Sequence, residues 1–112
     1  MKKIELITRP DKLEDVKELL NEQGVNGMTV TMVSGCGAQK GKREMYRGTA
    51  YDVNLLPKVK IECVVKDEMV EPLGAVIVER IRTGKIGDGK MFVYDVVDAL
   101  KVRTGEHGDD AI

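Results

Sequence analysis

The stretch Val59-Lys-Ile-Glu-Cys-Val-Val65 has the clearest strand pattern of this chain, and the prediction of the fold starts from it. Apolar residues occupy every second position from Val59 to Val65, and they alternate with the charged residues Lys58, Lys60 and Glu62. Because successive side chains of a β-strand point to opposite faces of a sheet, this pattern predicts a strand with one apolar face. The segments on either side of this strand then specify the fold.

The chain before this strand reads as strand, helix and strand. An apolar run around Ile4 to Ile7 predicts an opening strand, which ends at Arg9-Pro10 because proline disfavours helix in the residue before it. From Asp11 to Gln23 the apolar residues fall at helical spacing, and Gly24 is a natural stop. Met28 to Val33 alternates and is rich in β-branched residues, which predicts a second strand with one buried face.

The chain after this strand reads as helix, glycine-rich loop and strand. Residues 71–81 predict an amphipathic helix with Pro72 in its first turn, and Met91 to Val97 predict a last strand. The order β-α-β-β-α-β is that of an α+β, ferredoxin-like sandwich, in which two helices cover one face of an antiparallel sheet. The other face has no cover, and the candidates Ile7, Val64 and Phe92 on it suggest association with other copies.

The connection between the second and third strands is unusually long. About twenty irregular residues, from Gly35 to Asn54, join two strands that a few residues could join, and compact domains seldom use more than ~12–15. The segment is glycine-rich and basic, with Lys40, Lys42, Arg43 and Arg47 against two acids. A solvated hairpin is one interpretation. A functional binding loop is favoured, because so large a basic insertion on so small a domain is otherwise hard to explain.

Composition narrows the class of protein. The 112 residues, 42% apolar and 33% charged, fit one globular domain, and neither a transmembrane stretch nor a signal-peptide core is present, which predicts the cytoplasm. A net charge of −1 and 4% aromatic residues disfavour a nucleic-acid binder. Cys36 and Cys63 are far apart and are expected to be reduced, packed thiols. With His107 as the one histidine, a metal centre or Ser-His-Asp catalysis is not expected.

The loop Thr83-Gly-Lys-Ile-Gly-Asp-Gly-Lys90 has the composition of a phosphate site. Its glycines allow backbone N–H groups to converge on an anion, and Lys85 and Lys90 add positive charge. Gly84 to Lys90 even matches G-x-x-x-x-G-K, but Met91 stands where a P-loop needs Ser or Thr, and the order of strand and helix is reversed. From the loop alone, an anion site and a plain turn are equally good interpretations.

Five segments together resemble one known family. Tyr46-Arg-Gly-Thr-Ala-Tyr51 is similar to the loop signature of the PII signal-transduction proteins, departing at Thr49, and Thr83 to Val93 is similar to their second signature, departing at Met91. The runs 56–62, 27–31 and 103–106 also fit, so the resemblance covers the whole chain. It implies a homotrimer of single PII-like domains, residues 1–112, each with a flexible regulatory loop at about 37–54, a phosphate-binding loop at 83–90 and a polar C-terminal tail at 104–112.

The resemblance also implies a set of binding residues, with ATP or ADP in each of three clefts between neighbouring subunits. Gly87, Asp88, Gly89 and Lys90 would hold phosphates, Thr29, Glu62 and Val64 the adenine and ribose, and Arg103 of a neighbour would reach the phosphates. The further nucleotide-site residues are Gly35, Gly37, Ala38, Gln39, Thr83 and Lys101. Gln39 would also help to hold Mg²⁺ on ATP, and 2-oxoglutarate would meet Arg9, Gln39, Lys40, Gly41, Lys58 and Gly87. Tyr51 falls at the position of the family's uridylylated tyrosine.

The function that the resemblance implies is a non-enzymatic sensor. ATP and ADP would compete for one cleft, 2-oxoglutarate would join Mg-ATP, and the loop would grip or release an ammonium transporter or a nitrogen-assimilation enzyme, placing the cytoplasmic protein at the membrane in the first case. Ala38 stands where Arg is common, and Lys101 where a second Arg is common. An energy-only ADP/ATP sensor that serves another transporter is therefore the alternative within the family. A nucleotide-hydrolysing enzyme is the alternative of another class.

Overall fold

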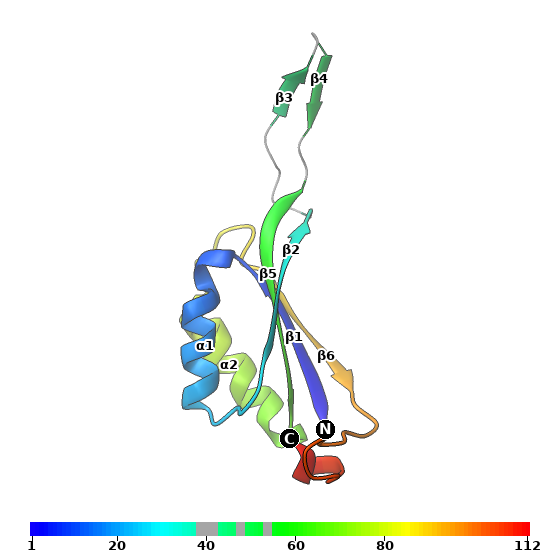
Figure 1. Cartoon of the computed structure of the whole chain (residues 1–112). Helices are drawn as coiled ribbons and strands as arrows, with labels where there is room; N and C mark the ends of the chain where they lie inside the picture. The colour runs from blue at the N-terminus through cyan, green and yellow to red at the C-terminus, as the bar shows by residue number, and fades with distance from the viewer. Residues whose placement is uncertain (38–42, 47–48, 53–54) are drawn as a thin grey trace.

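The core of the molecule is a four-stranded antiparallel sheet covered on one face by two helices (Figure 1). The computed structural model describes residues 1–37, 43–46, 49–52 and 55–112. The sheet has the strand order β2-β5-β1-β6. The strands are β1 (Lys2–Thr8), β2 (Thr29–Gly35), β5 (Leu56–Val65) and β6 (Lys90–Asp95), and the helices are α1 (Leu13–Glu22) and α2 (Val70–Ile81). Three short 3₁₀ turns are η1 (Pro10–Lys12), η2 (Asp67–Met69) and η3 (Gly108–Ala111).

This topology confirms the predicted ferredoxin-like order. The unit β1-α1-β2 encloses β5 between its two strands, and the unit β5-α2-β6 encloses β1 in the same way. Because β5 and β1 are the two inner strands, each pairs on both sides. The register places Ile61 opposite Leu6 of β1 and Val30 of β2. The alternating stretch that begins at Val59 thus lies at the centre of the fold.

The hydrophobic core lies between the two inner strands and the two helices. Its strand residues come from β1 and β5 alone, and its helix residues come from the faces of α1 and α2 that were predicted to be apolar. The buried members are Ile4, Leu6, Val16, Leu19, Leu20, Val59, Ile61, Cys63, Val65, Leu73, Ile77 and Ile81. Pro10 holds Arg9 extended (φ −66°, ψ 142°), so the turn η1 precedes α1 and the regular helix begins at Leu13.

Strand β2 differs from the prediction of one buried face. Val30 and Met32 lie on the same face as Ile61 and Val59, yet they are 40% and 62% exposed. The prediction was wrong because β2 is an edge strand, and the helices pack over β1 and β5 without covering it. Alternation identified the strand correctly, but it does not show how far the helix layer extends.

The last strand ends earlier than predicted. Its pairing stops at Asp95, opposite Lys2, and Val97 is fully exposed. The partner strand β1 begins at Lys2, so beyond Asp95 only the hydrogen bond from Val96 N–H to the Met1 carbonyl, at 3.2 Å, continues the contact. Apolar residues at positions 96 and 97 satisfied the strand pattern, but no neighbouring backbone remained to pair with them.

The long connection was predicted to be irregular, with a solvated hairpin as one interpretation, and it contains regular structure. Strands β3 (Arg43–Tyr46) and β4 (Thr49–Asp52) form a separate two-stranded antiparallel sheet, with Arg43 opposite Asp52. Describing residues 35–54 as wholly irregular was therefore wrong. A short isolated hairpin is hard to predict from sequence, because it has little apolar surface to bury and therefore imposes no clear alternation of apolar and polar residues.

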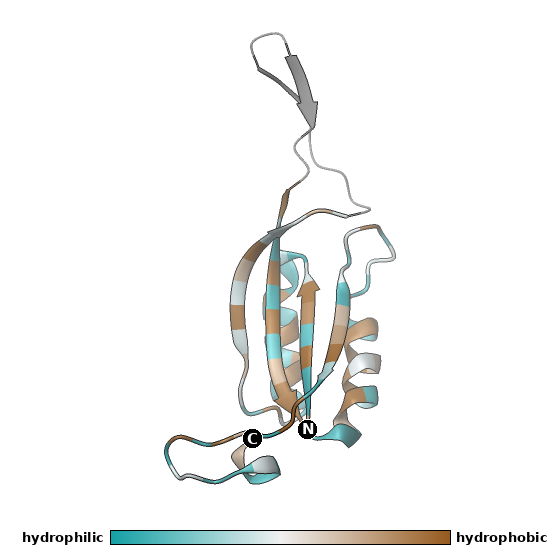
Figure 2. Ribbon diagram, turned by 90° about the vertical axis from the view of Figure 1, so that its right-hand side faces the viewer, coloured by the Kyte–Doolittle hydropathy of each residue, from teal (hydrophilic) through white to brown (hydrophobic). Residues whose placement is uncertain are grey.

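The second face of the sheet is uncovered in this chain, as predicted (Figure 2). Ile7, Val64 and Phe92 all lie on it, since each pairs with a charged residue of that face. The lysines and glutamates there contact one another: Lys3 Nζ lies 3.4 Å from Glu62 Oε2 and 4.7 Å from the ring centre of Tyr94. A mixed apolar and charged sheet face of this kind suits contact with other copies better than with solvent. Among the described residues, no helix is long and apolar enough to cross a membrane.

Candidate functional site

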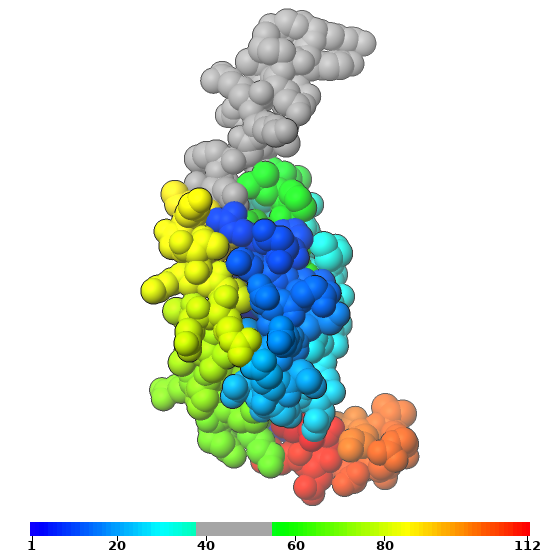
Figure 3. All heavy atoms as spheres, turned by 90° about the vertical axis from the view of Figure 1, so that its left-hand side faces the viewer, coloured from blue at the N-terminus to red at the C-terminus, as the bar shows by residue number. Residues whose placement is uncertain are grey.

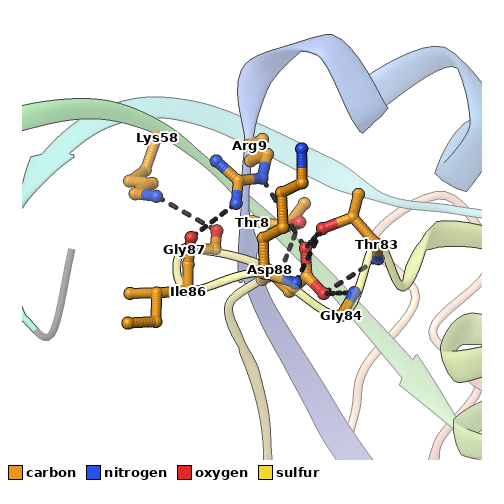
Figure 4. Close-up of polar contacts among 9 residues, drawn as sticks. Thr8, Arg9, Lys58, Thr83, Gly84, Ile86, Gly87 and Asp88 are labelled. Atoms are coloured by element: carbon orange, nitrogen blue, oxygen red, sulfur yellow. Dashed lines mark hydrogen bonds and ion pairs between the residues drawn. The ribbon is translucent and has the colours of Figure 1, made fainter.

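The loop between α2 and β6 is organised by the carboxylate of Asp88. Asp88 Oδ2 accepts hydrogen bonds from the backbone N–H groups of Thr83 and Gly84, both at 2.9 Å, and Oδ1 accepts one from the Thr83 hydroxyl at 2.5 Å (Figure 4). The hydrogen bond from the Thr83 hydroxyl is the largest cause that lowers the pKa of Asp88 to about 2. Gly84 and Gly87 have φ values of +84° and +103°, which side chains rarely allow. The loop is therefore pre-shaped and carries a firmly ionised carboxylate.

Residues from the ends of two strands fasten this loop to the sheet. The hydroxyl of Thr8, a buried residue, donates to the Asp88 carbonyl at 2.8 Å. The guanidinium of Arg9 donates to the Ile86 carbonyl at 2.6 Å, and the ammonium of Lys58 donates to the Gly87 carbonyl at 3.2 Å. These contacts turn three loop carbonyls toward the protein, as Figure 4 shows.

Some backbone donors of the loop remain available for a ligand. Within the described residues, the N–H groups of Ile86 and Gly87 have no hydrogen-bond partner. Consecutive unpaired N–H groups next to a glycine with positive φ form the kind of concave nest that binds anions. The loop therefore has the local chemistry of a phosphate or carboxylate site.

A cavity of about 450 Å³ opens beside this loop. Its walls come from the loop, from the end of β2 and the residues after it, and from the open face of the sheet: Ile7, Gly35, Cys36, Gly37, Leu56, Lys58, Lys85, Ile86, Gly87, Asp88, Gly89, Lys90 and Phe92. The volume falls within the range of small-molecule sites, about 300–1,000 Å³. Three lysines against one aspartate give the walls a positive balance, which favours an anionic ligand.

The predicted site residues fall into two groups, one at the cavity and one away from it. Six of them line the cavity together with Lys58: Gly35, Gly37, Gly87, Asp88, Gly89 and Lys90. Thr83 supports Asp88 from outside the cavity wall. Arg9 also lies outside the wall, with its Nε 3.6 Å from Asp88 Oδ1.

The second group lies away from the cavity. Thr29 pairs with Glu62, four residues along β5 from Lys58 and so about 13 Å away, and Val64 lies further still. Lys101 and Arg103 belong to the C-terminal segment, which Figure 1 shows at the end of the sheet opposite the loop. One chain therefore does not bring all the predicted residues to one place. Four predicted residues, Ala38, Gln39, Lys40 and Gly41, and the side chain of Tyr51 lie outside what the structure describes.

Several cavity residues were not predicted as site residues. Ile7 and Phe92 were assigned only to the open face, and Cys36 and Leu56 were not placed in the site, while Lys85 and Ile86 were predicted only as part of the phosphate-binding loop 83–90. Cys36 is exposed on the cavity wall, so its interpretation as a packed thiol was wrong. Cys63 is buried as predicted, and burial raises the pKa of its thiol. In the described part of the chain, no cluster of three or more His, Cys, Asp or Glu side chains could hold a metal ion.

Comparison with known proteins agrees with the resemblance seen in the sequence. The model of the family "Nitrogen regulatory protein P-II" matches residues 1–106. The chain is 57% identical to the nitrogen regulatory protein P-II of Pasteurella multocida strain Pm70, and 55% identical to those of Haemophilus influenzae and Escherichia coli K12, each over 112 residues and the full length of both chains. This chain belongs to the nitrogen regulatory protein P-II family.

Proposed function

We propose that the cavity beside loop 83–90 binds the phosphates of ATP or ADP, and that the nucleotide reports the energy state of the cell to a target protein. P-II proteins are signalling proteins rather than enzymes, which sets aside the nucleotide-hydrolysing alternative. The family is trimeric, and nucleotide and 2-oxoglutarate binding are general features of it. One observation carries the assignment to this cavity: Ile86 and Gly87, whose N–H groups have no partner among the described residues, line a site whose walls hold three lysines.

The two separated groups of predicted residues support a site shared between subunits. Gly87 and Lys90 line the cavity beside Lys58, whereas Glu62 lies about 13 Å from Lys58 along β5 and Val64 lies further. If subunits associate through the open sheet face, the residues of a neighbour that lie away from its own cavity would come next to the cavity residues of this chain. In that arrangement Arg103 and Lys101 of the neighbour would meet the phosphates, and Thr29, Glu62 and Val64 the base and ribose.

The role of Asp88 within this proposal is indirect. Its carboxylate is negatively charged and satisfied by Thr83 and Gly84, so it shapes the loop instead of contacting a phosphate. Any contact of Asp88 with the nucleotide would be made by its backbone N–H. Lys85 and Lys90 would balance the phosphate charge, and Gln39 would complete the oxygen ligands of Mg²⁺ bound to ATP.

We further propose 2-oxoglutarate as a second ligand at the same loop. Lys58 lines the cavity and its ammonium lies 3.2 Å from the Gly87 carbonyl, which places a cation beside the loop where a carboxylate would bind. Arg9 contacts the same loop through the Ile86 carbonyl and the Asp88 carboxylate. The alternative is an energy-only sensor that ignores this acid. The absence of an arginine at position 38 is the sequence feature that favours it.

The protein target is proposed only by class: a membrane transporter of the ammonium type, or an enzyme of nitrogen assimilation, regulated through the segment 37–54. An effector can shift such a segment only by its differential affinity for two conformations. Pull-down from native lysate with ATP and with ADP would identify a target that prefers one state. Intact-mass analysis of protein from nitrogen-starved cells would show whether Tyr51 carries a nucleotidyl group.

Calorimetric titration of Mg-ATP and ADP into the purified protein and into Gly87→Val tests the assignment of the cavity. Valine at φ +103° cannot keep this loop conformation, and we expect it to abolish nucleotide binding while the oligomeric mass stays unchanged. Val97→Ala, a change at a fully exposed position far from the loop, is the matched control and should bind as the wild type does. Unchanged ATP affinity in Gly87→Val would refute the cavity as the nucleotide site.

A further inference from the structure

The C-terminal segment folds back on itself to form a closed hairpin. Leu100 and His107 form an isolated antiparallel bridge. Two backbone hydrogen bonds flank this bridge: from Lys101 N–H to the Glu106 carbonyl at 2.9 Å, and from Gly108 N–H to the Ala99 carbonyl at 3.0 Å. Figure 3 shows the segment (orange to red) projecting at the end of the domain away from the yellow loop. It is a shaped element rather than the plain polar tail expected from its composition.

The carboxylate of Asp98 ties together the two ends of this hairpin. One oxygen, Oδ2, lies 2.9 Å from Nδ1 of His107. The other, Oδ1, accepts from the N–H groups of Ala99 at 2.9 Å and Gly108 at 3.1 Å. Residue 98 therefore bridges to residues 107 and 108 across the base. The hydrogen bond from His107 is the largest cause that lowers the pKa of Asp98.

The tip of the hairpin presents cationic side chains outward. Arg103 is exposed and makes no hydrogen bond or ion pair with a described residue, and Lys101 has only a 4.0 Å contact with Glu106. Val102 between them is 96% exposed. Among the described residues, no strand of the four-stranded sheet pairs with this tip. Its turn is closed by the N–H groups of Thr104 and Gly105, which donate to the Lys101 carbonyl at 3.3 and 2.7 Å, and the contacts of Asp98 close the base that orients the whole turn.

We propose that Asp98 is a positioning residue for nucleotide binding: by closing the base of hairpin 98–108 it holds Arg103 and Lys101 ready for the phosphates bound by a neighbouring copy. The inference rests on the proposed function, because it requires a nucleotide site shared between subunits. Its physical basis is preorganisation, since a loop ordered before binding loses less conformational entropy when the ligand arrives.

Positioning and simple electrostatics make opposite predictions for Asp98. Asp98 is an acid on the same hairpin as the cations, so a purely Coulombic view predicts that removing its charge strengthens binding of an anionic nucleotide. Positioning predicts weaker binding, because the hairpin opens. The sign of the change therefore distinguishes the two roles.

The test is calorimetric titration of Mg-ATP into the full-length wild type, Asp98→Ala, Arg103→Ala and the double variant. We expect Asp98→Ala to weaken ATP binding about fivefold or more. Asp109→Ala removes the same charge nearby from a side chain without a contact in the described structure, and it should stay within about twofold of the wild type. If Asp98 acts through Arg103, the double variant should bind ATP less than about twofold more weakly than Arg103→Ala alone.

Three results would overturn the proposal: equal or tighter ATP binding by Asp98→Ala, the same loss of ATP affinity in the presence and absence of Arg103, or a loss of affinity that accompanies a changed oligomeric mass.

NMR titration of the Asp98 carboxyl tests the closure without any nucleotide, since its pKa should be below the usual range in the wild type and higher in His107→Ala. A usual pKa in the wild type would show that the hairpin is open in solution. If the wild type bound no ATP while this titration behaved as expected, the nucleotide assignment itself would have failed, and the role of Asp98 in binding with it.

Discussion

A β-carbon on Gly89 would lie 1.8 Å from the carbonyl oxygen of Ile7 and 2.8 Å from its carbonyl carbon. Gly89 also has φ +98°, so two independent constraints require glycine there. The residue was predicted as a phosphate contact, and that contact stays a prediction. The structure adds a reason that needs no ligand: the loop crosses the end of β1 at backbone contact distance.

Replacing Gly89 should therefore destabilise the protein with or without nucleotide. We expect Gly89→Ala to lower the free energy of unfolding by about 2–5 kcal/mol, from backbone strain and from the clash with a carbonyl that cannot move aside. Urea denaturation of the protein without nucleotide measures it. Gly84→Ala is the matched control, since Gly84 has φ +84° but no atom within 4 Å of an added β-carbon, and it should cost about 1 kcal/mol. Equal losses in the two variants would contradict the packing argument.

The carboxylate of Asp88 should make stability depend on pH at its acid end. Its pKa in the folded protein is about 2, below the ordinary value of 3.8, so the folded state favours the ionised form. The resulting stability is fully present above about pH 4 and is lost as the pH falls through about 2. Asp88→Asn should be less stable than the wild type at pH 6, and the difference should shrink near pH 2.

Urea midpoints at the two pH values give this comparison. Asp15→Asn serves as the control, because Asp15 is exposed on α1 and its side chain makes no contact in the described structure. A wild-type advantage over Asp88→Asn that stays constant from pH 6 to pH 2 would show that the carboxylate is not the group responsible.

Lys58 should discriminate between the two proposed ligands. Lys58→Met removes the cation assigned to the carboxylate of 2-oxoglutarate, while Thr8 and Arg9 still fasten the loop. We expect the heat of 2-oxoglutarate binding to disappear and Mg-ATP affinity to change less than about fivefold. In the wild type, the acid should tighten ATP by the same factor by which ATP tightens the acid, typically about 5–150-fold.

Calorimetry with 2-oxoglutarate in saturating Mg-ATP, and then in Mg-ADP, decides between the two readings of this site. Lys60→Met is the matched control, since Lys60 lies on the same strand and face but pairs with Glu62 at 3.7 Å and does not line the cavity. Absence of heat in the wild type, with ATP binding intact, would favour the energy-only sensor. Normal acid binding by Lys58→Met would remove Lys58 from the site.

Phe92 should matter for association between copies. It is 43% exposed on the uncovered sheet face, where burial in an interface would remove apolar surface from water. Phe92→Asp should leave the monomer fold intact but weaken self-association, raising the midpoint concentration of assembly at least about tenfold. Analytical ultracentrifugation measures the mass. Val78→Asp, at a position 52% exposed on α2, should leave that mass unchanged, and equal effects of the two variants would argue against the sheet face as the interface.

Local patterns in the sequence determined most of the fold. The alternation around Val59 and Ile61 and the helical spacing of Val16 and Leu19 identify the strands and helices, because burial of one face imposes a period that can be read in one dimension. The glycines and lysines of loop 83–90 made an anion site one of two equal interpretations, because backbone conformation and charge are local properties. The family signatures then named the residues of a nucleotide site.

Only the tertiary structure decided how those residues are distributed in space. Gly87 and Glu62 are both expected at the nucleotide, yet they lie apart along the sheet, because a strand separates its residues by about 3.3 Å each regardless of their function. The exposure of Met32, the early end of β6 and the closure by Asp98 likewise depend on what lies beside each segment. The pairing of strands and the covering of a strand by helices involve residues that are far apart in the sequence, so the hydrophobic pattern of one segment does not reveal them.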